Sequence, residues 1–143
     1  MGYRFEFDPV NKILLGRVEG RLTEELATEF YGAIRKYSIA TDANAGIFDH
    51  SSVTELAISS DFVRNLAHSE PAMPDATRRP RFQVAPMTAG FGLGRMFQIL
   101  GEPTRPLLKV VHSVDEALAE LGVQSPHFEP LEWPSVDVNR PGC

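Results

Sequence analysis

The run Ala45-Gly46-Ile47-Phe48-Asp49-His50-Ser51-Ser52, followed by the pair Ser59-Ser60, decides the fold. Small and apolar residues at 45–48 are typical of a short strand that is buried on both faces, and we expect this strand to end at Asp49. Serine is a preferred residue at helix N-termini, so the pair predicts a helix from about Ser60 to His68. The sequence therefore predicts a recognition surface where a strand end meets a helix start.

The residues before this run predict a hairpin and a long helix. Aromatic and charged residues alternate over residues 3–8, and a turn leads from them into Ile13-Leu14-Leu15, which is the pattern of a β-hairpin. Thr23 precedes Glu24-Glu25, as expected for an N-cap and an acidic first helical turn. Apolar side chains then recur at helical spacing, and the predicted inner face consists of Leu26, Phe30, Ile34 and Tyr37.

A linker over residues 70–80 separates this part from the rest of the chain. Its three prolines exclude a regular helix, so we expect an exposed loop. Arg78, Arg79 and Arg81 cluster near its end, either as an indication of an acidic partner or simply as solvated charge.

Strands and helices continue to alternate after the linker. Phe82 and Val84 indicate a strand, the glycine-rich segment 89–94 begins a third helix, and Leu107 to His112 forms a fifth strand. The sequence Ser113-Val114-Asp115-Glu116 matches a capping box and opens a last helix that stops at Gly122. The prolines and apolar residues of 123–143 predict an extended tail that lies on its own domain or on a neighbour.

Composition limits the class of protein. The chain has 143 residues, of which 43% are hydrophobic, and its net charge of -5 is unfavourable for holding nucleic acid. One domain with a real core is expected. The single cysteine, Cys143, excludes an internal disulfide, and no apolar run is long enough to span a membrane. A cytoplasmic protein is the expectation.

The element order ββαβαβαβα, with a serine pair at the second helix, resembles the STAS domain of anti-anti-sigma factors and, more closely, the SpoIIAA-like family. The similarity covers about residues 3 to 122. Asp49-His50-Ser51 fits the strand end of the regulatory pattern, whereas Ile58 and Asp61 stand where that pattern has an acid and a glycine around its serine pair. The segment Gly90 to Gln98 is similar to a recurring signature of the SpoIIAA-like branch.

The resemblance implies a fold and a kind of partner. The expected fold is α/β, with a mixed sheet of about five strands and about four helices over residues 1–122, plus the extended C-terminal tail 123–143. The implied function is a non-catalytic signalling module that binds a regulatory protein, such as a kinase or an anti-sigma-like factor. The implied recognition or phosphorylation residues are Asp49, Ser51, Ser59 and Ser60.

Physical chemistry gives two interpretations of the serine pair. A helix start supplies free N–H groups and partial positive charge, which stabilise a phosphate. Asp61 already places a negative charge in that turn, so a phosphate on Ser59 or Ser60 would meet like-charge repulsion. Simple N-capping is the favoured interpretation, and phosphorylation is the alternative.

The pattern of apolar residues in the third helix predicts a second site. Its apolar residues cover an unusually wide arc, which indicates deep burial, a homodimer contact or a pocket for a small apolar, lipid-like ligand. We expect the interface or pocket to draw on Phe91, Arg95, Met96, Phe97 and Trp133.

Nucleotide binding by the glycine-rich segment is not favoured. Gly90, Gly92 and Gly94 fall one residue short of the dinucleotide fingerprint, and the lysine of a P-loop is absent. We expect the glycines to bring the helix close to the sheet instead.

Catalysis is not expected. The four histidines show no metal-ligand spacing. Asp49, His50 and Ser51 are the residue types of a catalytic triad, but neighbours in an extended strand point to opposite faces and cannot relay a proton. The sequence therefore predicts a binding protein without a metal or cofactor.

Overall fold

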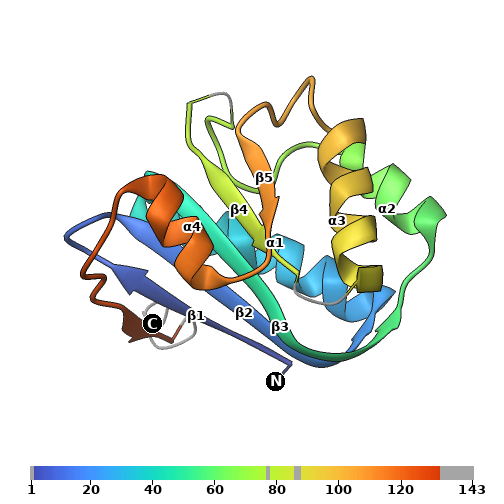
Figure 1. Cartoon of the computed structure of the whole chain (residues 1–143), viewed down its shortest axis with the longest axis horizontal. Coiled ribbons are helices and arrows are strands. Elements are labelled where there is room, and N and C mark those ends of the chain that lie inside the picture. The colour runs from blue at the N-terminus through green and yellow to red at the C-terminus, as the bar shows by residue number, and fades with distance from the viewer. Residues whose placement is uncertain (1, 77, 86–87, 133–143) are drawn as a thin grey trace, which may run out of the picture.

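The structure, a computed structural model, describes residues 2–76, 78–85 and 88–132. Within these ranges the chain forms one mixed sheet with helices on both faces (Figure 1). In chain order the elements are β1 (Tyr3–Asp8), β2 (Ile13–Thr23), α1 (Glu24–Thr41), β3 (Ala45–Ala57), α2 (Ser60–Ala67), β4 (Arg81–Val84), α3 (Thr88–Leu100), β5 (Leu108–Val111), α4 (Val114–Leu121) and β6 (Glu129–Leu131).

The sheet has the order β5-β4-β3-β2-β1-β6. Strands β2 to β5 are parallel, and β1 is antiparallel to both β2 and β6. The predicted α/β class and the order ββαβαβαβα are confirmed, and β6 adds a strand at the end.

Two apolar cores lie on the two faces of the sheet. Alternate residues of β2 divide between them, so that Leu14 packs with Phe30 and Tyr37 of α1, while Ile13 and Leu15 pack on the α4 side. This division follows from the two-residue repeat of a strand. Helices α2 and α3 pack against each other on the α1 side of the sheet (Figure 1).

The predicted helix caps are present. Thr23 accepts a hydrogen bond from the Leu26 amide, and Ser113 accepts one from the Glu116 amide. Glu116 reaches back to the amide of His112, one residue before the serine, so the capping box is not fully reciprocal. Gly122 ends α4 with a φ of 72°, a left-handed conformation that glycine adopts without strain.

The prediction that the third strand ends at Asp49 is wrong. Strand β3 continues to Ala57, and beyond Asp49 it pairs only with β2, because its pairing with β4 ends at Asp49 and Val84. The pairing register between β2 and β3 shifts twice in this region, between Arg17 and Glu19 and again after Gly20. These shifts are β-bulges, which bend a strand and change which residues face each side.

The first part of the C-terminal tail is a component of the sheet. In β6, Glu129 and Leu131 pair with Phe7 and Phe5 of β1. The buried carboxylate of Asp8 holds this region by accepting hydrogen bonds from the His127 amide and from Asn11. The tail therefore packs on its own domain as far as Glu132, and the remaining residues lie outside the described ranges.

The expectation that glycines bring α3 close to the sheet holds at Gly94. A Cβ atom at Gly94 would lie 3.3 Å from a Val110 methyl of β5, whereas a Cβ atom at Gly92 would meet no atom within 4 Å. Gly101 follows the end of α3, as predicted.

Candidate functional site

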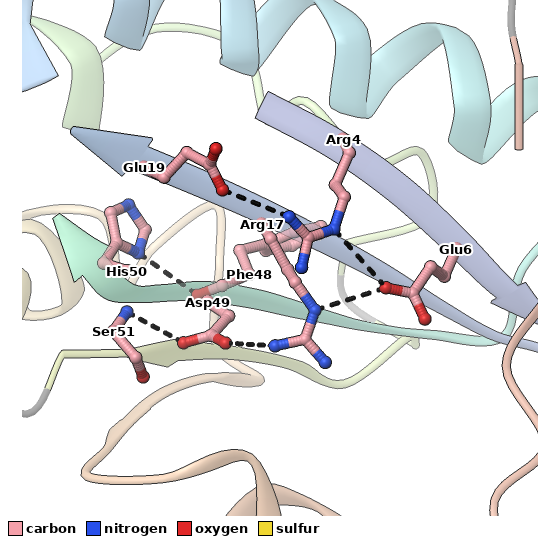
Figure 2. A network of polar contacts seen from close by, with 8 residues as sticks. All are labelled: Arg4, Glu6, Arg17, Glu19, Phe48, Asp49, His50 and Ser51. Carbon is pink, nitrogen blue, oxygen red and sulfur yellow. Dashed lines mark hydrogen bonds and ion pairs between the residues drawn. The ribbon is translucent and has the colours of Figure 1, made fainter. Parts of the chain in front are cut away.

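Asp49 anchors a row of charged side chains across three strands (Figure 2). Its Oδ2 atom accepts a hydrogen bond from Arg17 Nη1 at 2.7 Å, and Arg17 Nε lies 3.2 Å from Glu6 Oε2. Arg4 continues the row by pairing with Glu19 at 3.1 Å. The Asp49 side chain is 5% exposed and the Arg4 side chain is 60% exposed, so the Asp49 end is the buried end.

Asp49 also supports the first bulge of β3. Its Oδ1 atom accepts a hydrogen bond from the Ser51 amide at 2.9 Å, which satisfies a backbone donor where the pairing register shifts. Across this bulge and the second register shift, the residues of β3 that face the α1 side are His50, Val53 and Leu56 instead of every second residue. Because Asp49 is only 4% exposed, it positions the strand and does not present its carboxylate to a partner.

His50 faces the apolar side of the sheet. Its Nδ1 atom lies 3.2 Å from the Phe48 carbonyl oxygen (Figure 2), and its ring packs edge-on against Phe30. Burial holds the pKa of His50 below its ordinary value, although the Phe48 carbonyl and the Asp49 carboxylate oppose that effect. The ring is therefore neutral at neutral pH.

The serine pair begins α2, as predicted, and Ser59 is the N-cap. Its hydroxyl accepts a hydrogen bond from the Phe62 amide at 3.0 Å, and both its amide and its hydroxyl donate to Glu24 Oε2, at 3.0 and 3.1 Å. The starts of α1 and α2 are thus joined directly. Ser60 and Asp61 are exposed beside them, and Asp61 pairs with Arg64.

The structure does not bring the four predicted recognition residues together. Ala57 lies six residues beyond Ser51 in β3, which is roughly 20 Å of strand at ~3.3 Å per residue. Asp49 and Ser51 therefore lie near the middle of the sheet. Ser59 and Ser60 lie just beyond the far end of β3, past the segment of β3 that pairs only with β2. Only the second pair lies at a helix start.

The residues predicted on α3 have different surroundings. Phe97 lines a cavity and lies under the Arg105 guanidinium, 4.8 Å from it. Phe91 stacks on His112 with ring centres 4.2 Å apart, and exposed Arg95 donates to Gln98 on the same helix. Met96 is half-buried. Trp133 lies outside the described residues.

An apolar cavity of about 140 Å³ lies between the sheet and helices α1, α2 and α3. Its walls are mainly apolar side chains from six elements, among them Leu22, Phe30, Phe48, Phe62, Leu93 and Phe97. Arg81, Gln83 and His50 add polar groups from β4 and β3. Of the described residues that the sequence predicted for an apolar pocket beside the third helix, Phe97 lines this cavity, whereas Phe91, Arg95 and Met96 do not.

Sequence reasoning placed Arg81 wrongly in an exposed loop. Arg81 is the first residue of β4 and is 3% exposed. By contrast, Arg79 is a loop residue that pairs with Asp42 at 3.0 Å. A signal was available in the order Arg81-Phe82-Gln83-Val84, because alternation of polar and apolar residues in a central strand places both polar side chains on one buried face.

Within the described ranges, no helix is long and apolar enough to cross a membrane. The same residues contain no group of three or more histidine, cysteine, aspartate or glutamate side chains placed to hold a metal ion.

Comparison with solved structures gives two relevant neighbours. The structure of the anti-sigma factor antagonist SpoIIAA in its unphosphorylated form matches 86% of this chain and 99% of that chain, with a TM-score of 0.55 and 12% identity. An anti-sigma factor antagonist from Mycobacterium paratuberculosis matches 84% of this chain and 94% of that chain, with a TM-score of 0.50 and 17% identity. The chain has a STAS-like fold.

The expected STAS-like, SpoIIAA-like architecture is therefore confirmed at the level of fold. No protein-family model matches the sequence, and no curated protein matches it.

We predict that removal of the Asp49 carboxylate destabilises the domain. Asp49→Ala leaves Arg17 Nη1 and the Ser51 amide without the acceptor that each has in Asp49, although Arg17 Nε keeps Glu6, and it should cost about 2 kcal/mol of unfolding free energy. A double-mutant cycle with Arg17→Ala, measured by urea unfolding, should give a coupling energy of about 1 kcal/mol.

The pair Arg21–Glu55 is the matched control, because it joins the same two strands at 3.1 Å but both side chains are about 60% exposed. Its coupling energy should be below about 0.5 kcal/mol. Equal coupling in the two pairs would contradict the structural role given to Asp49.

Proposed function

We propose that this domain is a non-catalytic regulatory module that binds a protein partner, as its fold suggests. The observation that carries the proposal is the STAS-like fold shared with two anti-sigma factor antagonists. A kinase or an anti-sigma-like factor is the proposed class of partner, and the cytoplasm is the proposed location.

The proposed docking surface is the joined start of α1 and α2. Exposed Glu24, Glu25, Ser60 and Asp61 lie around the Ser59 cap. In this proposal, Asp49 and Ser51 support the strand that leads to this surface and take no direct part in docking. Three carboxylates on one small surface favour a partner that presents lysine or arginine.

N-capping remains the favoured role of Ser59, and the hydrogen bonds described above support it. Phosphorylation is the alternative. A phosphate on Ser59 would lie beside the Glu24 carboxylate, which now accepts from the serine hydroxyl, and would break that contact by like-charge repulsion. Phosphorylation would therefore separate the starts of α1 and α2.

We predict that Ser60→Arg combined with Glu25→Arg abolishes partner binding without unfolding the domain. Both residues are exposed, and among the described residues neither side chain makes a hydrogen bond or ion pair. The double variant adds two positive charges and removes one negative charge, which should weaken a complex with a basic partner at least about tenfold. The measurement is the yield and affinity of the complex recovered from the native host, with the melting temperature recorded in parallel.

Ser125→Arg is the control, because Ser125 is exposed in the segment between α4 and β6. It should bind like the wild type. If the double variant also retained full binding, the α1–α2 surface would not be the docking site.

We propose a second candidate function, binding of a small apolar ligand, because the cavity beside α3 favours it. A cavity of this size with apolar walls resembles those that hold benzene-sized molecules. The cavity wall includes Phe62 and Val63 of α2, and the start of α2 belongs to the proposed docking surface. Ligand binding and partner docking would therefore share this helix.

We predict that the purified protein binds benzyl alcohol and 1-hexanol in this cavity. NMR titration should shift the methyl and aromatic signals of Leu93, Phe97 and Leu22, which line it. Leu121, which packs on the α4 side, is the internal control. Shifts of equal size on both faces of the sheet, or none at all, would contradict this function.

Self-association through α3 remains a prediction. Ile99 is 61% exposed on that helix and is its most exposed large apolar side chain among the described residues.

A further inference from the structure

Arg81 is a buried cation in the wall of the apolar cavity. Its side chain lies among residues of α1, α2 and α3 that form the cavity, and Arg81 is 3% exposed. Burial of a charged group is costly unless hydrogen bonds and an opposite charge compensate for it. The question is therefore whether the protein supplies this guanidinium with hydrogen-bond acceptors and an opposite charge.

The compensation is incomplete. A guanidinium has five N–H donors. Within the described residues, one donor of Arg81 bonds to the Ala76 carbonyl at 3.2 Å, and the buried Nε atom has no partner. Within the part of the chain that the structure describes, no carboxylate forms an ion pair with Arg81.

Arg105 provides an internal comparison. It is also buried in the cavity wall and also lacks a carboxylate partner among the described residues. Its guanidinium donates to the carbonyls of Leu66, Ala67 and Ser69 at the end of α2. Arg105 thus closes a helix C-terminus, where a cation is favourable, and its role is structural. Arg81 has no equivalent set of acceptors.

The cavity therefore has a positive potential at its Arg81 end. Burial and, to a smaller extent, the charge of Arg105 lower the pKa of Arg81, Tyr31 opposes both effects, and the net pKa is about 10. Arg81 remains protonated at neutral pH. His50, which β3 contributes to the cavity wall, is neutral there and adds no compensating negative charge.

We propose that the cavity binds a small monocarboxylate, with its carboxylate paired with the Arg81 guanidinium and its apolar body against Phe97 and Leu93. This inference rests on the second proposed function and names its ligand class. A carboxylate matches the planar fork of a guanidinium and supplies both the missing acceptor and the missing charge.

The cavity limits the size of the acid. A volume of about 140 Å³ is close to that of a cavity that holds benzene. The apolar body should therefore contain about six carbon atoms, as in benzoate or hexanoate. Long-chain fatty acids exceed this volume.

The test compares each acid with its own alcohol. Benzoate and benzyl alcohol, and hexanoate and 1-hexanol, have similar apolar bodies but differ in charge. NMR titration of the wild-type chain should show each acid binding at least about tenfold more tightly than its alcohol, because only the acid forms the charged pair. Arg81→Met should reduce the affinity for the acids to that for the alcohols and leave alcohol binding within about twofold.

Arg95→Met is the matched control, since Arg95 is an exposed arginine of α3 that donates only to Gln98 among the described residues. It should leave acid binding unchanged. Arg81→Met should not lower the melting temperature, because it removes a charge that lacks a full set of partners.

The outcomes separate this inference from the function on which it rests. If the alcohols bind the wild type and the acids bind no better, apolar binding stands and the role of Arg81 is refuted. If neither alcohols nor acids bind, the cavity function and this inference fail together. If Arg81→Met does not fold, Arg81 is structural as well, and the wild-type comparison of acids with alcohols still decides the ligand class.

Discussion

The bulge that follows Asp49 in β3 is the constraint on which both candidate sites depend. A strand without it would alternate strictly, so Val53 would face the same side as Asp49 and away from α1. The hydrogen bond from the Ser51 amide to Asp49 satisfies the donor that the bulge displaces, and Arg17 balances the carboxylate charge. His50 and Val53 can then both line the cavity.

The two candidate sites share this strand and the helix after it. β3 contributes the wall of the cavity and then continues with β2 beyond the rest of the parallel sheet, to the point where Ser59 joins α2 to Glu24. Helix α2 has one face on the cavity, through Phe62 and Val63, and its start on the proposed docking surface. A ligand that moved α2 would therefore change the surface offered to a partner, which gives a physical route between binding of a small molecule and regulation.

Features that depend on neighbouring residues, such as helix caps, could be predicted from the sequence. Features that depend on the pairing of distant segments, such as the length of β3 and the burial of Arg81, were not predicted. Thr23, Ser59 and Ser113 were recognisable as caps because an N-cap depends on a few neighbouring residues. The extension of β3 was missed because its bulges break the two-residue repeat by which strands are recognised. Arg81 was misplaced because its proximity to Arg78 and Arg79 in sequence suggested a solvated loop, whereas the parallel pairing of β4 with β3 buries it. The distance between Ser51 and Ser59 likewise depends on the length of β3.

Amide hydrogen exchange of Asp49→Ala against the wild type tests the role of the bulge most directly. If Asp49 holds the bulge, protection should fall for the β3 amides after residue 50 and for the first turn of α2, while amides of β1 and of residues 13–16 in β2 keep theirs. Equal loss of protection throughout the sheet, or unchanged exchange at Ser51, would contradict the account.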